Sequence, residues 1–334
     1  MYKVIVRAFG GVEQLDIVDL PDPVPAAGEV VVGLTSIGMN NAELMARRGE
    51  YRLISGNPPF TPGLEGGGII LAVGSGVSDR IVGQRVILTL EAPASKGQGQ
   101  GTYQSHYVVR AEQTILAPDG IPNQLLGALW LPYITAWGCL VWQQALQPGQ
   151  TVLIPGASSS VAIAAAQVVK HQGGIAVGTT TSPDKLTKLQ AMPEAPYDHL
   201  ILTHDTDWYR SAKKLTGGKG FNVIFDPVAA GDFLNTEIRL LAQGGTLWIY
   251  GLLGKPDIVN VHPLIRKMAS LRGWVLNQLS GSDVEQTAYQ HVLQRIADGT
   301  YQMPIAAQFS LRDVRQAQTV MEQGRHVGKL ILVP

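Results

Sequence analysis

The sequence contains a single cysteine, Cys139, among its 334 residues. This excludes an internal disulfide and a zinc site built from a cluster of cysteines. Neither sign of charge predominates, because Lys and Arg together number 26, Asp and Glu number 26, and the formal net charge is zero. Such a balance provides no overall attraction to nucleic acid or to an acidic membrane surface.

Long apolar runs are also missing. Glycine, proline or polar residues interrupt the apolar stretches before they reach the length of a membrane span. The N-terminus, MYKVIVRAFGG, lacks the apolar segment and cleavage site of a signal peptide. We therefore expect a soluble, cytoplasmic protein. Its length and its 45% hydrophobic content allow two domains, each with its own core.

Two different patterns follow one another along the chain. The first part, to about residue 120, reads as short strands and turns, which is typical of a β-rich barrel or partly open sheet. Helical spacing follows at 121–146, and strands then alternate with helices, which predicts a parallel, doubly wound sheet. The expected strands are 151–155, 174–179, 199–202, 222–226 and 246–250, with a possible edge strand at 271–276. A mixed pattern returns near the C-terminus, so the second domain is predicted to be inserted into the first.

The turn after strand 151–155 reads GASSSVA and contains the main candidate ligand-binding residues. A dinucleotide-binding turn needs a sharp bend, room for pyrophosphate and close helix packing, which glycines usually supply. Here Ser159 stands at the position of closest approach, and the following helix N-terminus offers N–H groups and the positive end of its dipole. Taken alone, the turn fits equally well a plain strand-to-helix connection with a serine N-cap.

The end of the next strand favours the nucleotide interpretation. The segment IAVGTTTSPDK (175–185) has no carboxylate before the helix to hold the ribose hydroxyls of NAD, and it offers hydroxyl side chains and Lys185 instead. This set suits a 2′-phosphate and hence NADPH. The alternative is that Ser182 caps a helix while Lys185 points into solvent.

Further segments carry a family resemblance through their order and spacing. They are SIGMNNAEL, RRGEY, PGLEGGGIILAVGSGV, GTYQSHYVV, PYITAW, GGTLWIYG and GKLILV. With them the chain resembles the medium-chain dehydrogenase/reductase superfamily, and within it the zinc-independent quinone oxidoreductase group. The resemblance implies an α/β fold in which a Rossmann doubly wound domain, residues 124–272, is inserted in a β-rich GroES-like catalytic domain, residues 1–123 and 273–334.

Two departures from the zinc-dependent relatives concern the metal. Those relatives carry Cys at the position of Asn40 and His at the position of Leu64, and neither residue present here binds zinc. Since a catalytic zinc site needs three protein ligands, we expect no metal.

The resemblance also implies the site residues. Asn40 would lie near the nicotinamide ribose and the substrate, and Thr135 near the nicotinamide. The pyrophosphate would be bound by Ser158, Ser159, Ser160 and Val161, and the 2′-phosphate by Lys185 with Thr180 and Thr181. Asp226, Val228, Tyr250 and Gly251 would line the cofactor cleft. The catalytic candidates are Asn40, Tyr51 and Tyr133; alternatively, Asn40 only caps a turn and the tyrosines only pack.

These features predict an NADPH-dependent oxidoreductase that transfers a hydride to a quinone or another electron-poor conjugated carbonyl. The proton would come from Tyr51, Tyr133 or water. An enoyl or alkenal reductase acting on a C=C bond is the alternative enzyme, and a non-catalytic NADP(H)-binding protein is the alternative outside enzymes. We also expect a homodimer formed through an edge strand, either GTLWIYG or LRGWVL.

Overall fold

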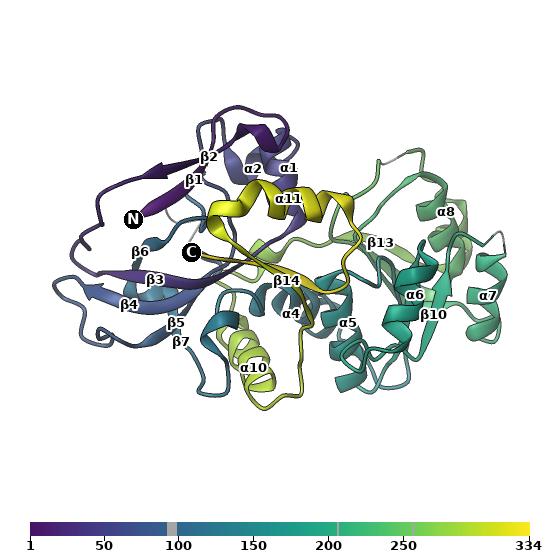
Figure 1. Ribbon diagram of the computed structural model, residues 1–334. Coiled ribbons are helices and arrows are strands. Elements are labelled where there is room, and N and C mark those ends of the chain that lie inside the picture. The colour runs from purple at the N-terminus through teal and green to yellow at the C-terminus, as the bar shows by residue number, and fades with distance from the viewer. Residues whose placement is uncertain (92–98, 206, 256) are drawn as a thin grey trace. The chain divides into compact units, whose positions relative to one another are not determined.

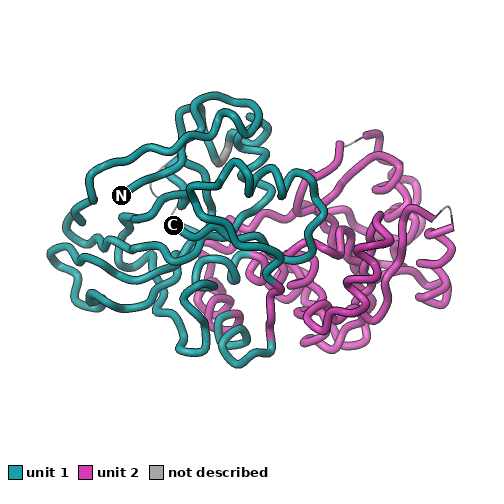
Figure 2. The backbone as a smooth tube through the Cα atoms, in the orientation of Figure 1, with its two compact units in different colours: residues 1–131, 293–300, 305–334 teal, residues 132–292, 301–304 magenta. Residues whose placement is uncertain are grey.

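The computed structural model describes residues 1–91, 99–205, 207–255 and 257–334. The chain forms two compact units, shown in different colours in Figure 2. Unit 1 comprises residues 1–131, 293–300 and 305–334, and unit 2 comprises residues 132–292 and 301–304. Both chain ends therefore belong to unit 1, and almost all of unit 2 is one continuous insertion. The domain boundaries expected from the sequence, after residues 123 and 272, stay a prediction.

Unit 2 is built on a six-stranded, fully parallel sheet (Figure 1). Its strands are β8 (Thr151–Ile154), β9 (Ile175–Thr180), β10 (His199–Leu202), β11 (Phe221–Asp226), β12 (Leu241–Ile249) and β13 (Ser270–Gly273). Their order in the sheet, β10-β9-β8-β11-β12-β13, is that of a doubly wound nucleotide-binding domain.

Helices connect these strands and cover the sheet. They are α5 (Ser160–His171), α6 (Pro183–Gln190), α7 (Trp208–Leu215), α8 (Gly231–Leu240) and α9 (His262–Lys267). In α5, residues 162–169 are all buried, as a helix covered along most of its length requires. Helix α6 begins where its sequence signals a start, because the Ser182 side chain accepts a hydrogen bond from the backbone N–H of Lys185 and a proline opens the first turn.

The segment 121–146, predicted to have helical spacing throughout, is divided in the structure. It forms η3 (Asn123–Leu125), α4 (Trp130–Trp137) and the π-helical η4 (Gly138–Gln143). Gly127 lies between η3 and α4, and a Cβ there would lie 2.0 Å from the carbonyl oxygen of Ser36. Glycine at this position thus permits the close approach of two backbone segments.

Unit 1 contains a mostly antiparallel sheet centred on β3 (Glu29–Gly38), which pairs with three other strands. Six further strands belong to this sheet: β4 (Gly67–Val73), β5 (Arg85–Leu88), β6 (His106–Arg110), β7 (Thr114–Leu116), β14 (Ile305–Ser310) and β15 (Lys329–Val333). Two other strands of unit 1, β1 (Tyr2–Val6) and β2 (Leu15–Asp19), pair with each other. Its helices are α1 (Asn41–Arg48), α2 (Arg52–Ser55) and α11 (Val314–Gln323), while α10 (Glu285–Ala297) leads back from unit 2. Short 3-10 turns lie at Val12–Gln14, Ala111–Gln113, Leu276–Gln278 and Leu311–Asp313.

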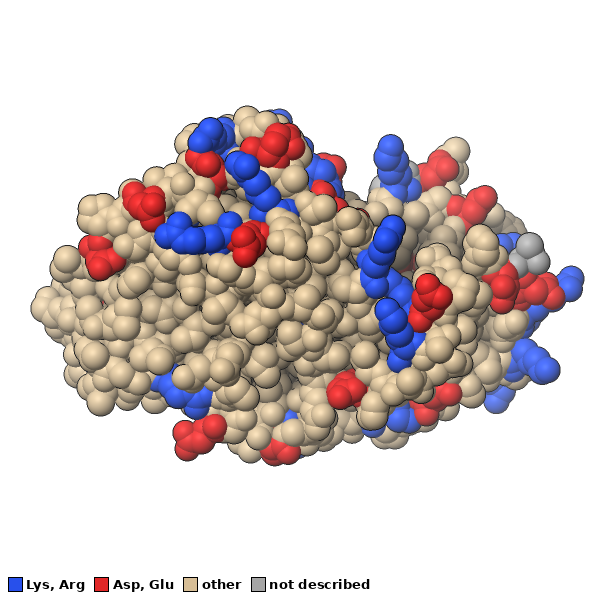
Figure 3. All heavy atoms as spheres, in the orientation of Figure 1, with Lys and Arg blue, Asp and Glu red and all other residues tan. Residues whose placement is uncertain are grey.

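The predicted fold class, a Rossmann-like domain within a β-rich domain, is confirmed. Within the described ranges, none of the helices combines the length and apolarity that crossing a bilayer would require. Figure 3 shows acidic and basic side chains interspersed on the visible face, without a continuous field of one sign.

Candidate functional site

The serine-rich turn joins β8 to α5 at the carboxyl end of the parallel sheet. Gly156 adopts a φ of 65°, which favours glycine at this bend. The Ser159 hydroxyl caps α5 by accepting a hydrogen bond from the N–H of Ala162 at 3.3 Å. Since the first N–H groups of a helix have no partner within it, those of Ser160 and Val161 remain for a ligand. The turn therefore has a serine cap and a helix N-terminus of the kind at which anions can bind.

Lys185 reaches back from α6 to this turn. Its ammonium donates a hydrogen bond to the Ser158 hydroxyl at 2.9 Å, which joins two predicted site residues that are 27 positions apart. Partial burial lowers the pKa of Lys185, and nearby Lys188 lowers it further. Thr180 is buried at the end of β9 and accepts a hydrogen bond from the Ser182 N–H, whereas Thr181 is exposed. A cation and hydroxyl groups thus surround the position where a nucleotide phosphate would lie.

Asp226 is the last residue of β11, and its buried side chain holds the loop that follows the strand. Its carboxylate accepts hydrogen bonds from the N–H groups of Val228 and Ala229, each at 2.7 Å. Burial raises the pKa of Asp226, and these two backbone bonds oppose that rise. The loop that includes half-buried Val228 is held in turn by the Gly254 N–H, which donates to the Val228 carbonyl at 2.9 Å. Asp226 therefore shapes the rim of the sheet edge, and its carboxylate is already engaged.

Tyr250 and Gly251 follow β12 at the same sheet edge. The Tyr250 ring stacks on Phe225 with ring centroids 4.0 Å apart, and its buried hydroxyl faces the Ser159 side chain. Burial raises the pKa of Tyr250 well above its usual value, the charge of Asp226 raises it further, and the Ser159 hydroxyl opposes this. At Gly251, a Cβ would lie 2.9 Å from the Pro227 carbonyl oxygen. Tyr250 therefore lies beside the serine turn at this end of the sheet.

The predicted residues of α4 are buried. Tyr133 is 0% exposed, its hydroxyl donates to the Gln167 side chain at 3.0 Å, and its ring stacks on Tyr301 with centroids 4.9 Å apart. The Thr135 carbonyl accepts a hydrogen bond from the Trp274 indole at 3.1 Å. These contacts give Tyr133 a packing role in unit 2.

Asn40 and Tyr51 belong to unit 1. Half-buried Tyr51 immediately precedes α2, and half-buried Asn40 is the N-cap of α1. The Asn40 amide oxygen accepts a hydrogen bond from Lys329 at 2.7 Å, and its nitrogen donates to Glu65 at 3.1 Å. Lys329 is not among the site residues expected from the sequence. The available signal was a lysine that opens the otherwise apolar strand KLILV, where its side chain is buried.

The position occupied by a zinc ligand in metal-dependent relatives does not fit a metal here. The Lys329 ammonium lies against Asn40 and pairs with Glu65, so a second cation would be repelled. Leu64 offers no ligand atom. Over the part of the chain that the structure describes, no group of three or more His, Cys, Asp or Glu side chains is arranged for metal binding.

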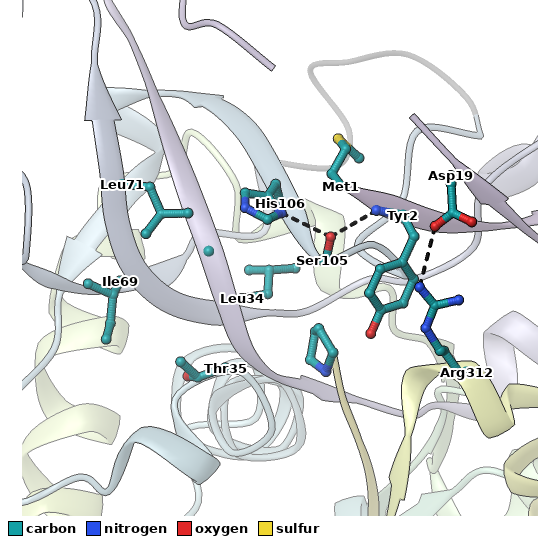
Figure 4. Close-up of a pocket in the computed structure, with 12 residues that line it drawn as sticks. Met1, Tyr2, Asp19, Leu34, Thr35, Ile69, Leu71, Ser105, His106 and Arg312 are labelled. Carbon is teal, nitrogen blue, oxygen red and sulfur yellow. Dashed lines mark hydrogen bonds and ion pairs between the residues drawn. The ribbon is translucent and has the colours of Figure 1, made fainter. Parts of the chain in front are cut away.

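A separate pocket of about 610 Å³ lies in unit 1 (Figure 4). Arg312 forms one wall, with its guanidinium 4.1 Å from the centroid of the Tyr2 ring and 3.3 Å from the Asp19 carboxylate. None of the predicted site residues lines this pocket.

The fold and the residues at the carboxyl end of its parallel sheet are those expected of a dinucleotide-binding oxidoreductase, and comparisons with known proteins specify the family. Residues 26–119 match the alcohol dehydrogenase GroES-like domain, and residues 160–298 match the zinc-binding dehydrogenase family. The human synaptic vesicle membrane protein VAT-1 homolog is 30% identical over 350 residues, covering 99% of this chain and 86% of that protein. Human quinone oxidoreductase is 28% identical over 340 residues, covering 100% and 98% of the two chains.

Among solved structures, a quinone oxidoreductase from Escherichia coli complexed with NADPH superposes with a TM-score of 0.87 over the full length of both chains, at 24% identity. The chain belongs to the medium-chain dehydrogenase/reductase superfamily, in its quinone oxidoreductase-like group, which confirms the resemblance noted in the sequence.

Proposed function

We propose that this oxidoreductase uses NADPH to reduce a quinone or another electron-poor conjugated carbonyl, without zinc. The contact between Lys185 and Ser158 carries the proposal, because it brings a cation to the turn where a dinucleotide phosphate would bind. The quinone oxidoreductase relatives support the reaction class, and the NADPH complex of the Escherichia coli protein supports the cofactor.

The residues at the sheet edge fit such a cofactor. The free N–H groups at the start of α5 suit a pyrophosphate, and Lys185 with Thr180 and Thr181 suits the 2′-phosphate. The Tyr250 hydroxyl, beside Ser159, offers a hydrogen-bond donor at the same edge. Asn40 is the proposed contact for the nicotinamide ribose. When bound, the nicotinamide supplies a hydride.

After hydride transfer to a conjugated acceptor, the product needs only a proton on the resulting anion. Positioning of cofactor and acceptor is then the main task of the protein. The buried Tyr133 hydroxyl is engaged with Gln167, so the proposed proton source is Tyr51 or water. The cytoplasmic location also stays a prediction.

The proposal predicts NADPH oxidation by quinones or enals that a chelator does not slow, since no residue set for zinc is present in the described ranges. Absorbance of NADPH should fall with quinones such as benzoquinone or with enals, in buffer with and without EDTA. Preference for enals over quinones would favour the C=C reductase. Tight NADPH binding without turnover of any acceptor would refute the enzyme assignment in favour of a binding protein, and stoichiometric zinc by elemental analysis would refute zinc independence.

Replacing Lys185 with alanine should weaken NADPH binding about tenfold and leave NADH binding nearly unchanged. A partly exposed ammonium–phosphate contact contributes about 1–2 kcal/mol, and each 1.4 kcal/mol is a decade in Kd. Lys188→Ala is the matched control, because it removes an exposed lysine from the same helix. Fluorescence titrations with both cofactors measure the effect. Equal losses for NADH and NADPH, or no loss for either, would rule out this role.

We also propose a homodimer that forms at β13. Of the two strands expected as edges, β12 is interior because it pairs with both β11 and β13, whereas β13 ends the sheet. The loop and helix that precede β13 expose several large apolar side chains: Leu252, Leu253, Ile258, Val261, Ile265 and Met268. An open strand edge next to exposed apolar side chains is typical of a surface that pairs with another chain.

A further inference from the structure

Two carboxyl side chains face each other in the interior of unit 2. Asp226, at the end of β11, and Glu237, on α8, are both 0% exposed, and their side chains form a hydrogen-bonded pair. Apart from Asp226, no group of the described residues lies at hydrogen-bond distance from either oxygen of Glu237. A buried acid without a cation or an N–H donor beside it is costly to retain, which indicates a specific role for Glu237.

The different partners of the two carboxyl groups determine which of them holds a proton. Asp226 accepts hydrogen bonds from the backbone N–H groups of Val228 and Ala229, each at 2.7 Å, and such donors stabilise a carboxylate. Glu237 has no comparable donor in the described structure. Two buried carboxylates that face each other repel strongly, so a pair of this kind retains one proton. The proton is therefore favoured on Glu237, where its O–H donates to the Asp226 carboxylate.

The charges around the pair agree with this assignment. Burial raises the pKa of Glu237 well above its usual value, and the charge of Asp226 raises it further. Of the charged groups in the described residues, it is Asp226 that acts on Glu237. Tyr250, just after β12, is next to Asp226, and its pKa is raised by burial and then by the Asp226 charge, so its phenol stays neutral. Glu237 consequently remains uncharged at neutral pH.

The two helices that pack against α8 place their ionisable groups elsewhere. Tyr209 of α7 lies under the guanidinium of Arg239, 5.1 Å from its ring centroid, and Lys267 of α9 donates to the Arg239 carbonyl at 2.6 Å. Both contacts are made with Arg239, near the end of α8. The remaining ionisable residues of these two helices are exposed: Arg210, Lys213, Lys214, His262 and Arg266.

The Asp226 carboxylate holds a loop with a strained backbone. Ala229 has a φ of 49°, in the left-handed region that is unfavourable for a residue with a Cβ, and its N–H is one of the two that Asp226 binds. The loop also touches the serine turn, since a Cβ at Gly156 would lie 3.6 Å from the Pro227 ring. A change at Asp226 would therefore be transmitted to the turn where a dinucleotide phosphate would bind.

We propose that Glu237 is a positioning residue that, as a neutral acid, donates a hydrogen bond to Asp226 and thereby holds the loop 227–230 against the serine turn. Its effect on the cofactor rests on the proposed function, whereas its hydrogen bond to Asp226 does not. Without this donor, Asp226 keeps only its backbone donors and holds Ala229 less firmly. Loss of one hydrogen bond that orders the loop corresponds to a roughly three- to tenfold weaker Kd for NADPH.

Stability as a function of pH tests whether Glu237 is neutral. An unfolded glutamate ionises at about pH 4.3, whereas the folded chain keeps this proton to higher pH, so the folded state binds more protons above pH 4.3. Up to the raised pKa of the folded state, each unit of pH therefore lowers the folding equilibrium constant about tenfold relative to a protein without this acid. Glu237→Gln keeps a donor and cannot ionise. Its advantage in stability over wild type should thus grow with pH.

Urea unfolding from about pH 5.5 to about pH 8.5, a range above the unfolded pKa, measures this advantage. Asp232→Asn is the matched control, because it removes an exposed carboxyl group from the same helix and should give a curve parallel to that of wild type. The infrared difference between wild type and Glu237→Gln at neutral pH should show the C=O stretch of a protonated carboxyl group. Parallel stability curves for wild type and Glu237→Gln, or carboxylate bands in that difference, would overturn the neutral acid.

Fluorescence titration with NADPH tests the positioning role. Glu237→Met removes the donor at similar volume and should bind NADPH roughly three- to tenfold more weakly, whereas Glu237→Gln should bind like wild type. Full affinity in Glu237→Met, or the same loss in both variants, would overturn this role. Absence of NADPH binding by wild type would instead overturn the proposed function, while the unfolding and infrared measurements would still decide the hydrogen bond to Asp226. Circular dichroism establishes that each variant is folded, and Glu237→Gln decides the proton assignment even where Glu237→Met does not fold.

Discussion

Replacing Ser159 with aspartate is expected to abolish detectable NADPH binding, with a Kd at least a hundredfold higher. Ser159 caps α5 directly beside the N–H groups proposed to bind pyrophosphate. Two like charges about 4 Å apart repel by about 4 kcal/mol at the effective dielectric of a protein surface. Each 1.4 kcal/mol is a factor of ten, so even a partly relaxed repulsion exceeds a hundredfold.

This substitution distinguishes ligand binding from folding. Aspartate is as good an N-cap as serine and its charge favours a helix N-terminus, so α5 should keep its stability. Ser159→Asn is the matched neutral control, since asparagine also caps and adds similar bulk without charge. Fluorescence titration should show most of the NADPH affinity in Ser159→Asn and none in Ser159→Asp. Unchanged affinity in Ser159→Asp would show that this turn is not the phosphate site.

The parallel sheet could be predicted from the sequence because its signals are local. The strand predicted at 199–202 is β10, with the same bounds in the structure. Apolar periodicity, a serine cap and Pro183 all act within a few residues. The π-helical turn at Gly138–Gln143 had no such local signal, and its first residue packs against a residue distant in sequence, since a Cβ at Gly138 would lie 2.7 Å from the Trp274 ring.

The candidate site likewise combines residues that could be predicted from local sequence with residues that depend on distant contacts. Ser158 and Lys185 could be selected from adjacent strand–helix units, and the structure brings their side chains together. The contact between Lys329 and Asn40 could not be predicted in this way, because Lys329 is 289 residues from Asn40 and reaches it only after β15 pairs with β3. A tyrosine on a helix likewise does not reveal its surroundings. Only the packed structure shows that Gln167 and Tyr301 enclose Tyr133.

A charge introduced at Ile265 should convert the proposed homodimer into a monomer. Ile265 is 73% exposed on α9, just before the edge strand β13, so Ile265→Glu should not disturb the fold of a single chain. In a two-fold symmetric dimer each substitution enters the interface twice. With about 2 kcal/mol for each buried, unpaired charge at such a contact, dimerisation should weaken about a thousandfold.

Light scattering on a size-exclusion column measures the mass of each protein at micromolar concentration. Wild type should elute as a dimer and Ile265→Glu as a monomer. Val24→Glu is the matched control, because Val24 is 87% exposed and belongs to unit 1 whereas β13 belongs to unit 2, so its replacement should leave the dimer intact. The dimer should also persist at high salt, because salt screens exposed ion pairs but does not screen strand pairing or apolar burial. A monomeric wild type would disprove the dimer, and a dimeric Ile265→Glu would move the interface away from the β13 edge.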